Sequence, residues 1–252
     1  MTLEVVGHDG LGDAELQAEW VALAATDPHA TIFQGPRFLG VWRDVLAPRE
    51  QVQVTTVREG GDLRGVVVAS HVTEGADTVW RFGGGTEVTD YAGPVIADGH
   101  REAVLDAWLP TVVADESVDR FEFNGMADDT GLPAAIEQRL DIPGANVKRS
   151  RQDVCPVVSI AGGFDAYLEA LPGKLRQEQK RKARKLGRDL GQVSIDQVAA
   201  EDIEQGLDTF FAMQADAASP KAGFFQRDVM RTFFSALADE FVADDVMQLH
   251  VL

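Results

Sequence analysis

The strongest constraint on the fold is a run of basic residues at positions 172–191, which reads PGKLRQEQKRKARKLGRDLG. Eight of the chain's 23 lysines and arginines lie there beside two carboxylates, so the run carries +6 and the other residues carry −24 within a total of −18. Pro172 and Gly173 precede the run and Gly191 follows it, as at the two ends of a helix. We interpret it as a helix that marks a boundary in the chain and that meets an anion.

Composition limits the class of protein. The chain is 45% hydrophobic and 25% charged, as in soluble globular proteins. It has no uncharged apolar run of about 18 residues to span a membrane, and it begins without the pattern of a signal peptide. The single cysteine, Cys155, is typical of a reducing cytoplasm, so we expect a cytoplasmic protein. The acidity favours solubility or an acidic interaction surface, and it argues against broad nucleic-acid binding.

The first 160 residues show alternating strand and helix patterns. Asp13 is placed to cap a helix, and Pro36 suits the first position of another. The predicted strands cover 3–6, 51–57, 64–72, 78–82, 120–124, 145–150 and 154–160. The other predicted helices cover 36–46, 98–109, where Pro110 kinks or shortens the helix, and 132–140. The predicted order is β-α-α-β-β-β-α-β-α-β-β.

The pattern begins again after residue 160. We predict helices at 164–171, 173–191, 201–214 and 226–241, and strands at 193–198 and 246–252. The second part thus repeats a β-α-α-β order and stops at an apolar strand, from which we expect a longer gene product. We predict three regions: a first domain at 1–160, a basic helical segment at 161–191, and the start of a second domain at 192–252.

Three segments carry a resemblance to a known family. Residues 32–42 read IFQGPRFLGVW, residues 82–91 read FGGGTEVTDY, and residues 167–188 read YLEALPGKLRQEQKRKARKLGR. In this order they resemble the FemAB-like branch of the GNAT acyltransferase superfamily, in particular the CelD-like acyltransferases. The resemblance implies an α/β (α+β) fold: a mixed, mostly antiparallel sheet flanked by helices, in tandem, with the second copy incomplete.

The resemblance also implies a function. We expect an acyl group to move from acyl-CoA, such as acetyl-CoA, or a similar donor to an amine or hydroxyl of a small molecule or cell-envelope or polysaccharide precursor. Metal is not expected, and tRNA is the one nucleic acid left open. The superfamily binds the donor pyrophosphate at an Arg/Gln-x-x-Gly-x-Gly/Ala motif, which residues 83–99 lack. This chain is therefore expected to lack its donor site, and the alternative is a non-catalytic module that docks an anionic ligand or partner.

Two groups of residues are candidates for binding. The predicted substrate-binding residues are Asp90, Tyr91, Trp42 and Phe33. Asp90 and Tyr91 offer a carboxylate and a phenol for orientation or proton transfer, although their glycine-rich loop also suits a structural turn. Phe33 and Trp42 suit either the core or the wall of a substrate site. No catalytic base is identified.

The basic helix has two interpretations. The predicted phosphate-binding residues are Lys174, Arg176, Lys180, Arg181, Arg184 and Lys185. The alternative is a solvated helix that packs through a sparse stripe of leucines.

The remaining reactive residues give no motif. The histidines show no metal-ligand spacing; they are His8, His29, His71, His100 and His250. Cys155 is predicted to be a buried small side chain in a strand, and Asp128–Asp129 and Asp244–Asp245 are predicted to be surface turns.

Overall fold

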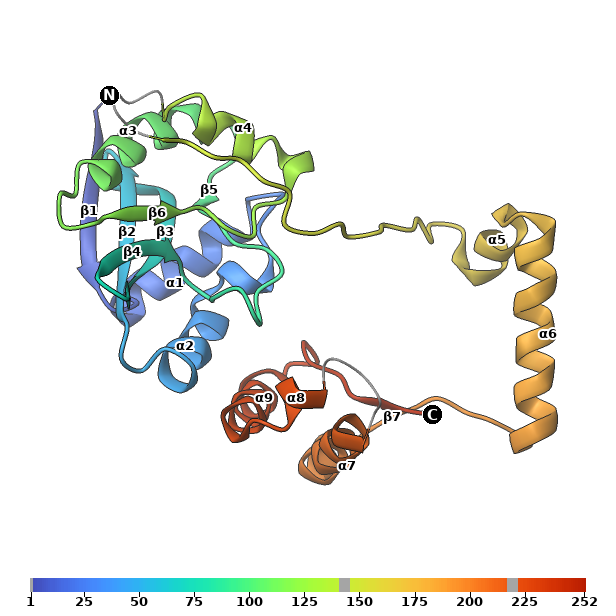
Figure 1. The fold of residues 1–252 in the computed structure, drawn as a ribbon. Helices are drawn as coiled ribbons and strands as arrows, with labels where there is room; N and C mark the ends of the chain where they lie inside the picture. Colours follow the sequence, from blue (N-terminus) through green and yellow to red (C-terminus); the bar gives the residue numbers. More distant parts are fainter. Residues whose placement is uncertain (1, 141–145, 217–221) are drawn as a thin grey trace.

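The protein has a mixed α/β fold in which helices flank a mostly antiparallel sheet (Figure 1). The computed structural model describes residues 2–140, 146–216 and 222–252. The strands are β1 (Leu3–Asp9), β2 (Gln51–Glu59), β3 (Asp62–Glu74), β4 (Asp77–Phe82), β5 (Val95–Ile96), β6 (Arg120–Glu122), β7 (Asp196–Gln197) and β8 (His250–Val251). The α-helices are α1 (Ala14–Ala24), α2 (Pro36–Val45), α3 (Arg101–Val113), α4 (Leu132–Glu137), α5 (Gly163–Ala170), α6 (Gly173–Leu190), α7 (Ile203–Asp216), α8 (Ala222–Phe225) and α9 (Asp228–Phe241). The short 3₁₀ helices are η1 (Ile32–Gln34), η2 (Asp128–Thr130) and η3 (Ala200–Asp202).

The main sheet has the strand order β1-β2-β3-β4-β6, and β5 pairs with the start of β3. Its neighbouring strands are antiparallel except β4 and β6, which run parallel with Trp80 opposite Phe121. A parallel pair needs a crossover, and α3 supplies it. β2 and β3 form a hairpin around Gly60 and Gly61, whose φ angles of 58° and 94° suit the tight turn.

Helices cover both faces of this sheet, so its central strands are apolar on both sides. Val66 and Val68 of β3 face the core under α1 and α2, while Val67 and Ala69 face the core under α3 and α4. Each core is built around buried tryptophans; these are Trp20 and Trp42 in the first and Trp80 and Trp108 in the second. The predicted helix cap at Asp13 is confirmed, because Asp13 Oδ1 accepts a hydrogen bond from Leu16 N at 2.9 Å. Helix α3 begins three residues later than predicted and continues past Pro110.

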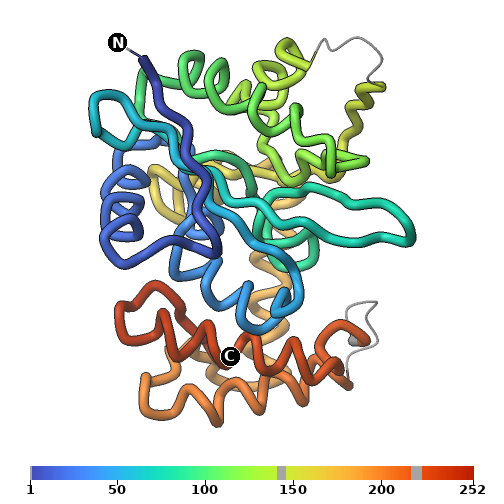
Figure 2. The backbone as a smooth tube through the Cα atoms, turned by 90° about the vertical axis from the view of Figure 1, so that its left-hand side faces the viewer, coloured from blue at the N-terminus to red at the C-terminus, as the bar shows by residue number. Residues whose placement is uncertain are grey.

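The carboxy-terminal helices pack against the first part of the chain through α9. Phe233, Leu237 and Phe241 of α9 join the core beneath α2, and the rings of Phe38 and Phe233 meet edge to face at 6.0 Å. Arg37 of α2 forms ion pairs with Glu240 and Asp244, the latter at 2.6 Å. Both views place α9 beside α2 (Figures 1 and 2). The apolar face predicted for 226–241 is thus buried.

The second segment resembles the first in connectivity, with the short helix α8 added between its two long helices. β7 pairs antiparallel with β8, as β1 pairs with β2. Both strands are much shorter than the predictions of 193–198 and 246–252, because β7 and β8 form a sheet with no further strand in the described part of the chain. Because β7 and β8 pair only with each other among the described strands, most backbone N–H and C=O groups of 193–198 and 246–252 have no strand to form hydrogen bonds with.

The two strands predicted before residue 160 do not form. Residues 146–150 and 154–160 are extended without a sheet partner, and residue 145 lies outside the described residues. This segment forms a hydrogen bond near the sheet through Gln152, whose Oε1 accepts from Gly125 N at 3.2 Å. Pro156 lacks a donor for a ladder, and Val157 and Ile160 are 89% and 70% exposed.

Helices α5 and α6 follow this extended segment and stand apart from the sheet (Figure 1). The basic segment forms α6, with Pro172 before it and Gly191 at its end, as predicted. Neither α5 nor α6 contains a buried residue. We call α5 and α6 together the arm.

Candidate functional site

The larger of two cavities in the described part of the chain lies at the amino-terminal end of α3, and we call it the α3 pocket. Its volume is about 620 Å³, within the range of small-molecule sites. Its walls come from the turn after α1, from β5, from the start of α3, and from η2 and α4. The lining includes Asp27, His29, Thr31, Gln34, Tyr91, Asp98, Arg101, Glu102, Asp129 and Thr130.

Hydrogen bonds hold these walls together. Asp27 accepts from the backbone N–H of His29 through Oδ1 and of Ile96 through Oδ2, both at 2.9 Å, so it ties the turn after α1 to β5. Arg101 donates from Nη1 to the carbonyl of Thr130 at 2.6 Å, which fixes the start of α3 against η2. The pocket is therefore built from several anchored elements rather than from one loop.

The pocket is acidic. Its lining contains four carboxylates, Asp27, Asp98, Glu102 and Asp129, against the single guanidinium of Arg101. Glu102 is paired with Arg139 at 2.6 Å. Within the described residues, Asp98 and Asp129 form no ion pair and both are exposed. The pocket thus attracts a cation more readily than an anion.

Tyr91 adds a phenol to the wall. The hydrogen bond and charge of the neighbouring Cys155 thiol, followed by partial desolvation and the charges of Asp90 and Asp129, raise the pKa of Tyr91. The phenol therefore stays protonated at neutral pH and serves as a hydrogen-bond donor rather than as a base. Cys155 is exposed in the extended segment, so the prediction of a buried cysteine in a strand was wrong.

The structure brings together two of the four predicted substrate-binding residues. The rings of Phe33 and Tyr91 lie 6.4 Å apart beside the α3 pocket, which Tyr91 lines. Asp90 is exposed and lies outside the lining, while Trp42 is 3% exposed within the core. The predicted phosphate-binding residues all lie on α6, away from this pocket; they are Lys174, Arg176, Lys180, Arg181, Arg184 and Lys185.

The glycine-rich loop serves the packing of the chain. A Cβ at Gly83 would lie 2.7 Å from a methyl of Val68. Gly84 has φ +101° and accepts a hydrogen bond from the Thr89 hydroxyl at 2.8 Å. This loop is therefore a structural turn, the alternative that the sequence left open.

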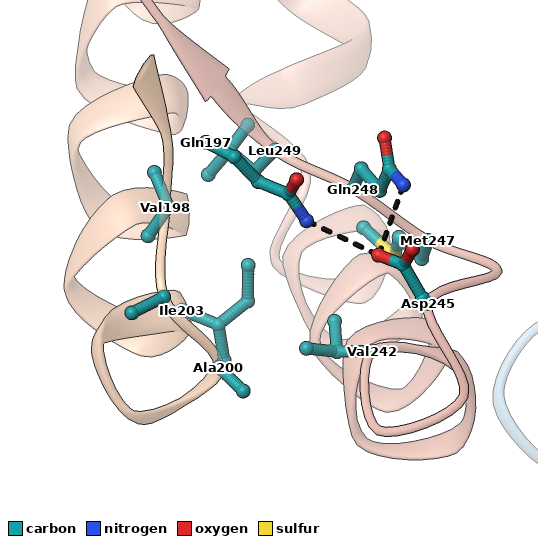
Figure 3. Close-up of a pocket in the computed structure, with 10 residues that line it drawn as sticks. Gln197, Val198, Ala200, Ile203, Val242, Asp245, Met247, Gln248 and Leu249 are labelled. Carbon is teal, nitrogen blue, oxygen red and sulfur yellow. Dashed lines mark hydrogen bonds between the residues drawn. The ribbon is translucent and has the colours of Figure 1, made fainter.

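A second cavity of about 250 Å³ lies between the end of α9 and β7 (Figure 3). Its lining is mainly apolar and includes Val198, Ile203 and Met247. At its edge, Asp245 accepts from the side-chain amides of Gln197 and Gln248 at 3.1 and 2.9 Å. Because this cavity is smaller and its carboxylate is already bonded, the α3 pocket is the better candidate site.

The acidic lining was missed from the sequence. Asp98 was interpreted as the start of a helix, and Asp128–Asp129 as a surface turn. Asp98 follows β5 and Asp129 lies in η2. Because β5 pairs with β3 and β6 pairs with β4, no local signal in the sequence indicated that these two residues meet.

Comparison with protein-family models and with curated proteins finds no match for this chain. The described residues contain no cluster of three or more His, Cys, Asp or Glu placed to hold a metal ion. In the same residues, no helix combines the length and apolar character needed to cross a bilayer.

Proposed function

We propose that the chain takes part in acyl transfer to an amine and that the α3 pocket binds the acceptor. The observation that carries this proposal is the pocket's place beside β5 and the start of α3, the crossover helix that joins the parallel strands β4 and β6 of an otherwise antiparallel main sheet. A mixed, mostly antiparallel sheet flanked by helices is what the resemblance to GNAT-like acyltransferases implies. The repeated β-α-α-β connectivity supports a tandem arrangement of two such units.

The charge of the pocket favours an amine as the acceptor. Asp98 and Asp129 attract a protonated amine and accept its hydrogen bonds. Tyr91, a phenol that is protonated at neutral pH, donates a hydrogen bond to an oxygen of the acceptor. These three side chains bind and orient the acceptor. Its ammonium releases a proton to solvent before the nitrogen attacks the acyl carbonyl, and the donor's thiolate leaves and takes up a proton in turn.

The same pocket does not fit the pyrophosphate of an acyl-CoA donor. The first turn of α3 leaves backbone N–H groups free, and Arg101 is present, but Asp98 and Glu102 flank this helix start. The Arg/Gln-x-x-Gly-x-Gly/Ala motif is also missing from 83–99. We therefore assign the acceptor to the α3 pocket and no donor phosphate.

The first experiment is calorimetric titration with amines, including an amino sugar and a polyamine, each compared with its N-acetylated form. We expect the amine to bind about fivefold more tightly than the neutral form, because a charge pair contributes roughly 1 kcal/mol. Asp129→Asn is expected to weaken binding several-fold, while Asp239→Asn on the exposed side of α9 leaves it unchanged. Equal affinity for both forms, or no binding by any amine, would remove the acceptor assignment.

The second experiment measures transfer of a labelled acyl group to the amine that binds best. Tyr91→Phe removes the hydrogen bond that orients the acceptor, so it is expected to weaken amine binding several-fold and to lower the transfer rate by at least as much. A chain that binds amines but transfers no acyl group from any activated donor would contradict the acyl-transfer proposal and leave the amine pocket intact.

A further inference from the structure

Helix α6 of the arm is amphipathic and basic, and within the described residues its apolar side is not buried. Leu175, Leu186 and Leu190 are 48%, 39% and 70% exposed and lie at helical spacing, with Ala183 between them. On an α-helix these positions form one narrow stripe. This stripe is therefore open to a partner.

The opposite side of α6 is basic. Lys174, Arg181, Lys185 and Arg188 share that side, and Lys180 and Arg184 lie next to them. The only carboxylates on the helix are Glu178 and Asp189, and their ion pairs with α6 cations are 3.3–4.0 Å long. Among the described residues, Lys174, Arg176, Lys180 and Arg184 form no ion pair, so half of the eight basic side chains of α6 are available.

Helix α5 adds aromatic side chains at the same end of the molecule. Phe164 is 69% exposed, and its ring lies 6.1 Å from that of Tyr167. Exposed aromatic rings beside basic residues are typical of segments that lie at a membrane–water interface.

We propose that the arm docks on an anionic phospholipid surface. The leucine stripe and Phe164 enter the headgroup layer, and the lysines and arginines contact lipid phosphates. This docking goes beyond the acyl-transfer proposal and does not depend on it. It is peripheral, because no described helix could span a membrane.

The charge of the rest of the chain determines which part can approach an anionic surface. Outside 172–191 the chain carries −24, which an anionic surface repels. The extended segment at 146–162 holds the arm away from the sheet (Figure 1), so α6 reaches the surface first. Single-stranded nucleic acid is a poorer match, because the aromatic rings of the arm lie on α5 and the basic face of α6 itself has none on which successive bases could stack.

The test is flotation with vesicles of phosphatidylcholine, alone or mixed with phosphatidylglycerol. We expect flotation only with the anionic vesicles, and loss of it as salt is raised. Arg181→Glu with Lys185→Glu is expected to lower the vesicle partition coefficient on the order of tenfold or more, since each basic residue near the surface contributes about 1 kcal/mol. The control, Arg49→Glu with Lys148→Glu, makes the same charge change at exposed positions outside the arm and leaves flotation unchanged.

A second variant tests the apolar stripe. Leu186→Ser with Leu190→Ser keeps every charge and is expected to lower partition several-fold. Circular dichroism of each variant checks that the fold is retained. The proposal is overturned if the protein does not float, if arm variants float like the controls, or if the arm instead binds a short RNA or a second copy of the chain without binding vesicles.

Discussion

The sheet-bearing body and the arm use the same residue types in opposite ways. In the body, Arg139 is 17% exposed and pairs with Glu102 and Asp106 at 2.6 and 2.7 Å. In the arm, Arg188 is 74% exposed and has a single 3.5 Å pair with its neighbour Asp189. Arginines of the body neutralise local carboxylates and hold elements together, whereas the basic residues of the arm remain free for an outside anion.

Apolar residues show the same contrast. Trp20 and Trp108 of the body are fully buried, while Leu190 and Phe164 of the arm are mostly exposed. Helix α6 therefore gains little from tertiary packing, and an isolated helix of its 18 residues is only marginally stable in water. A surface that binds both its apolar and its basic side would stabilise it.

The largest expected difference between body and arm is in stability. Phe233→Ala removes a ring buried between α9 and α2 and is expected to lower the free energy of unfolding by about 3–5 kcal/mol. Leu186→Ala on the arm is expected to change it by less than about 0.5 kcal/mol. Urea denaturation measures both, and equal losses would break the contrast between a packed body and an unpacked arm.

A smaller effect is expected in acid. The hydroxyl and backbone N–H of Ser117 lower the pKa of the body carboxylate Asp115, as the ion pairs of Arg81 and Arg120 lower that of Glu74. Each carboxylate stabilises the fold above its unfolded pKa of about 4, and this contribution is lost as pH falls through the lower folded pKa. Ser117→Ala should raise the pKa of Asp115. The free energy of unfolding of the variant should then depend less on pH between the unfolded and the folded pKa of Asp115.

The measurement is an NMR titration of Asp115 together with acid unfolding followed by circular dichroism. An unchanged Asp115 pKa in the Ser117→Ala variant would contradict the role of the Ser117 hydroxyl, since the backbone N–H bond remains. The NMR signals of α6 should depend on pH differently from those of the body, which would separate the arm from the body in the same titration.

Local signals predicted much of this fold. The Asp13 cap, the turn at Gly60 and Gly61, and the breaks around α6 each depend on a few neighbouring residues. Long-range pairing could not be predicted in the same way. Residues 154–160 have the composition of a strand, but a strand needs a partner edge, and here none is paired with it.

The candidate site was harder to predict than the elements around it. Phe33 and Tyr91 were singled out and lie together, but Asp98 and Asp129 enter the pocket from segments separated by all of α3 and β6. Similarly, the apolar face containing Phe233 was evident, while its partner α2 lies far away in the sequence. Both depend on tertiary arrangement, which spacing along the chain does not encode.

Hydrogen–deuterium exchange with and without anionic vesicles tests the contrast between body and arm most directly. Without vesicles, we expect the amides of α6 to exchange rapidly and those of α2 and α9 to be protected together. With anionic vesicles, exchange in α6 should slow while α2 and α9 stay unchanged. Protection of α6 before vesicles are added, or exchange in α6 that vesicles do not alter, would contradict the account of a free arm that docks on a lipid surface.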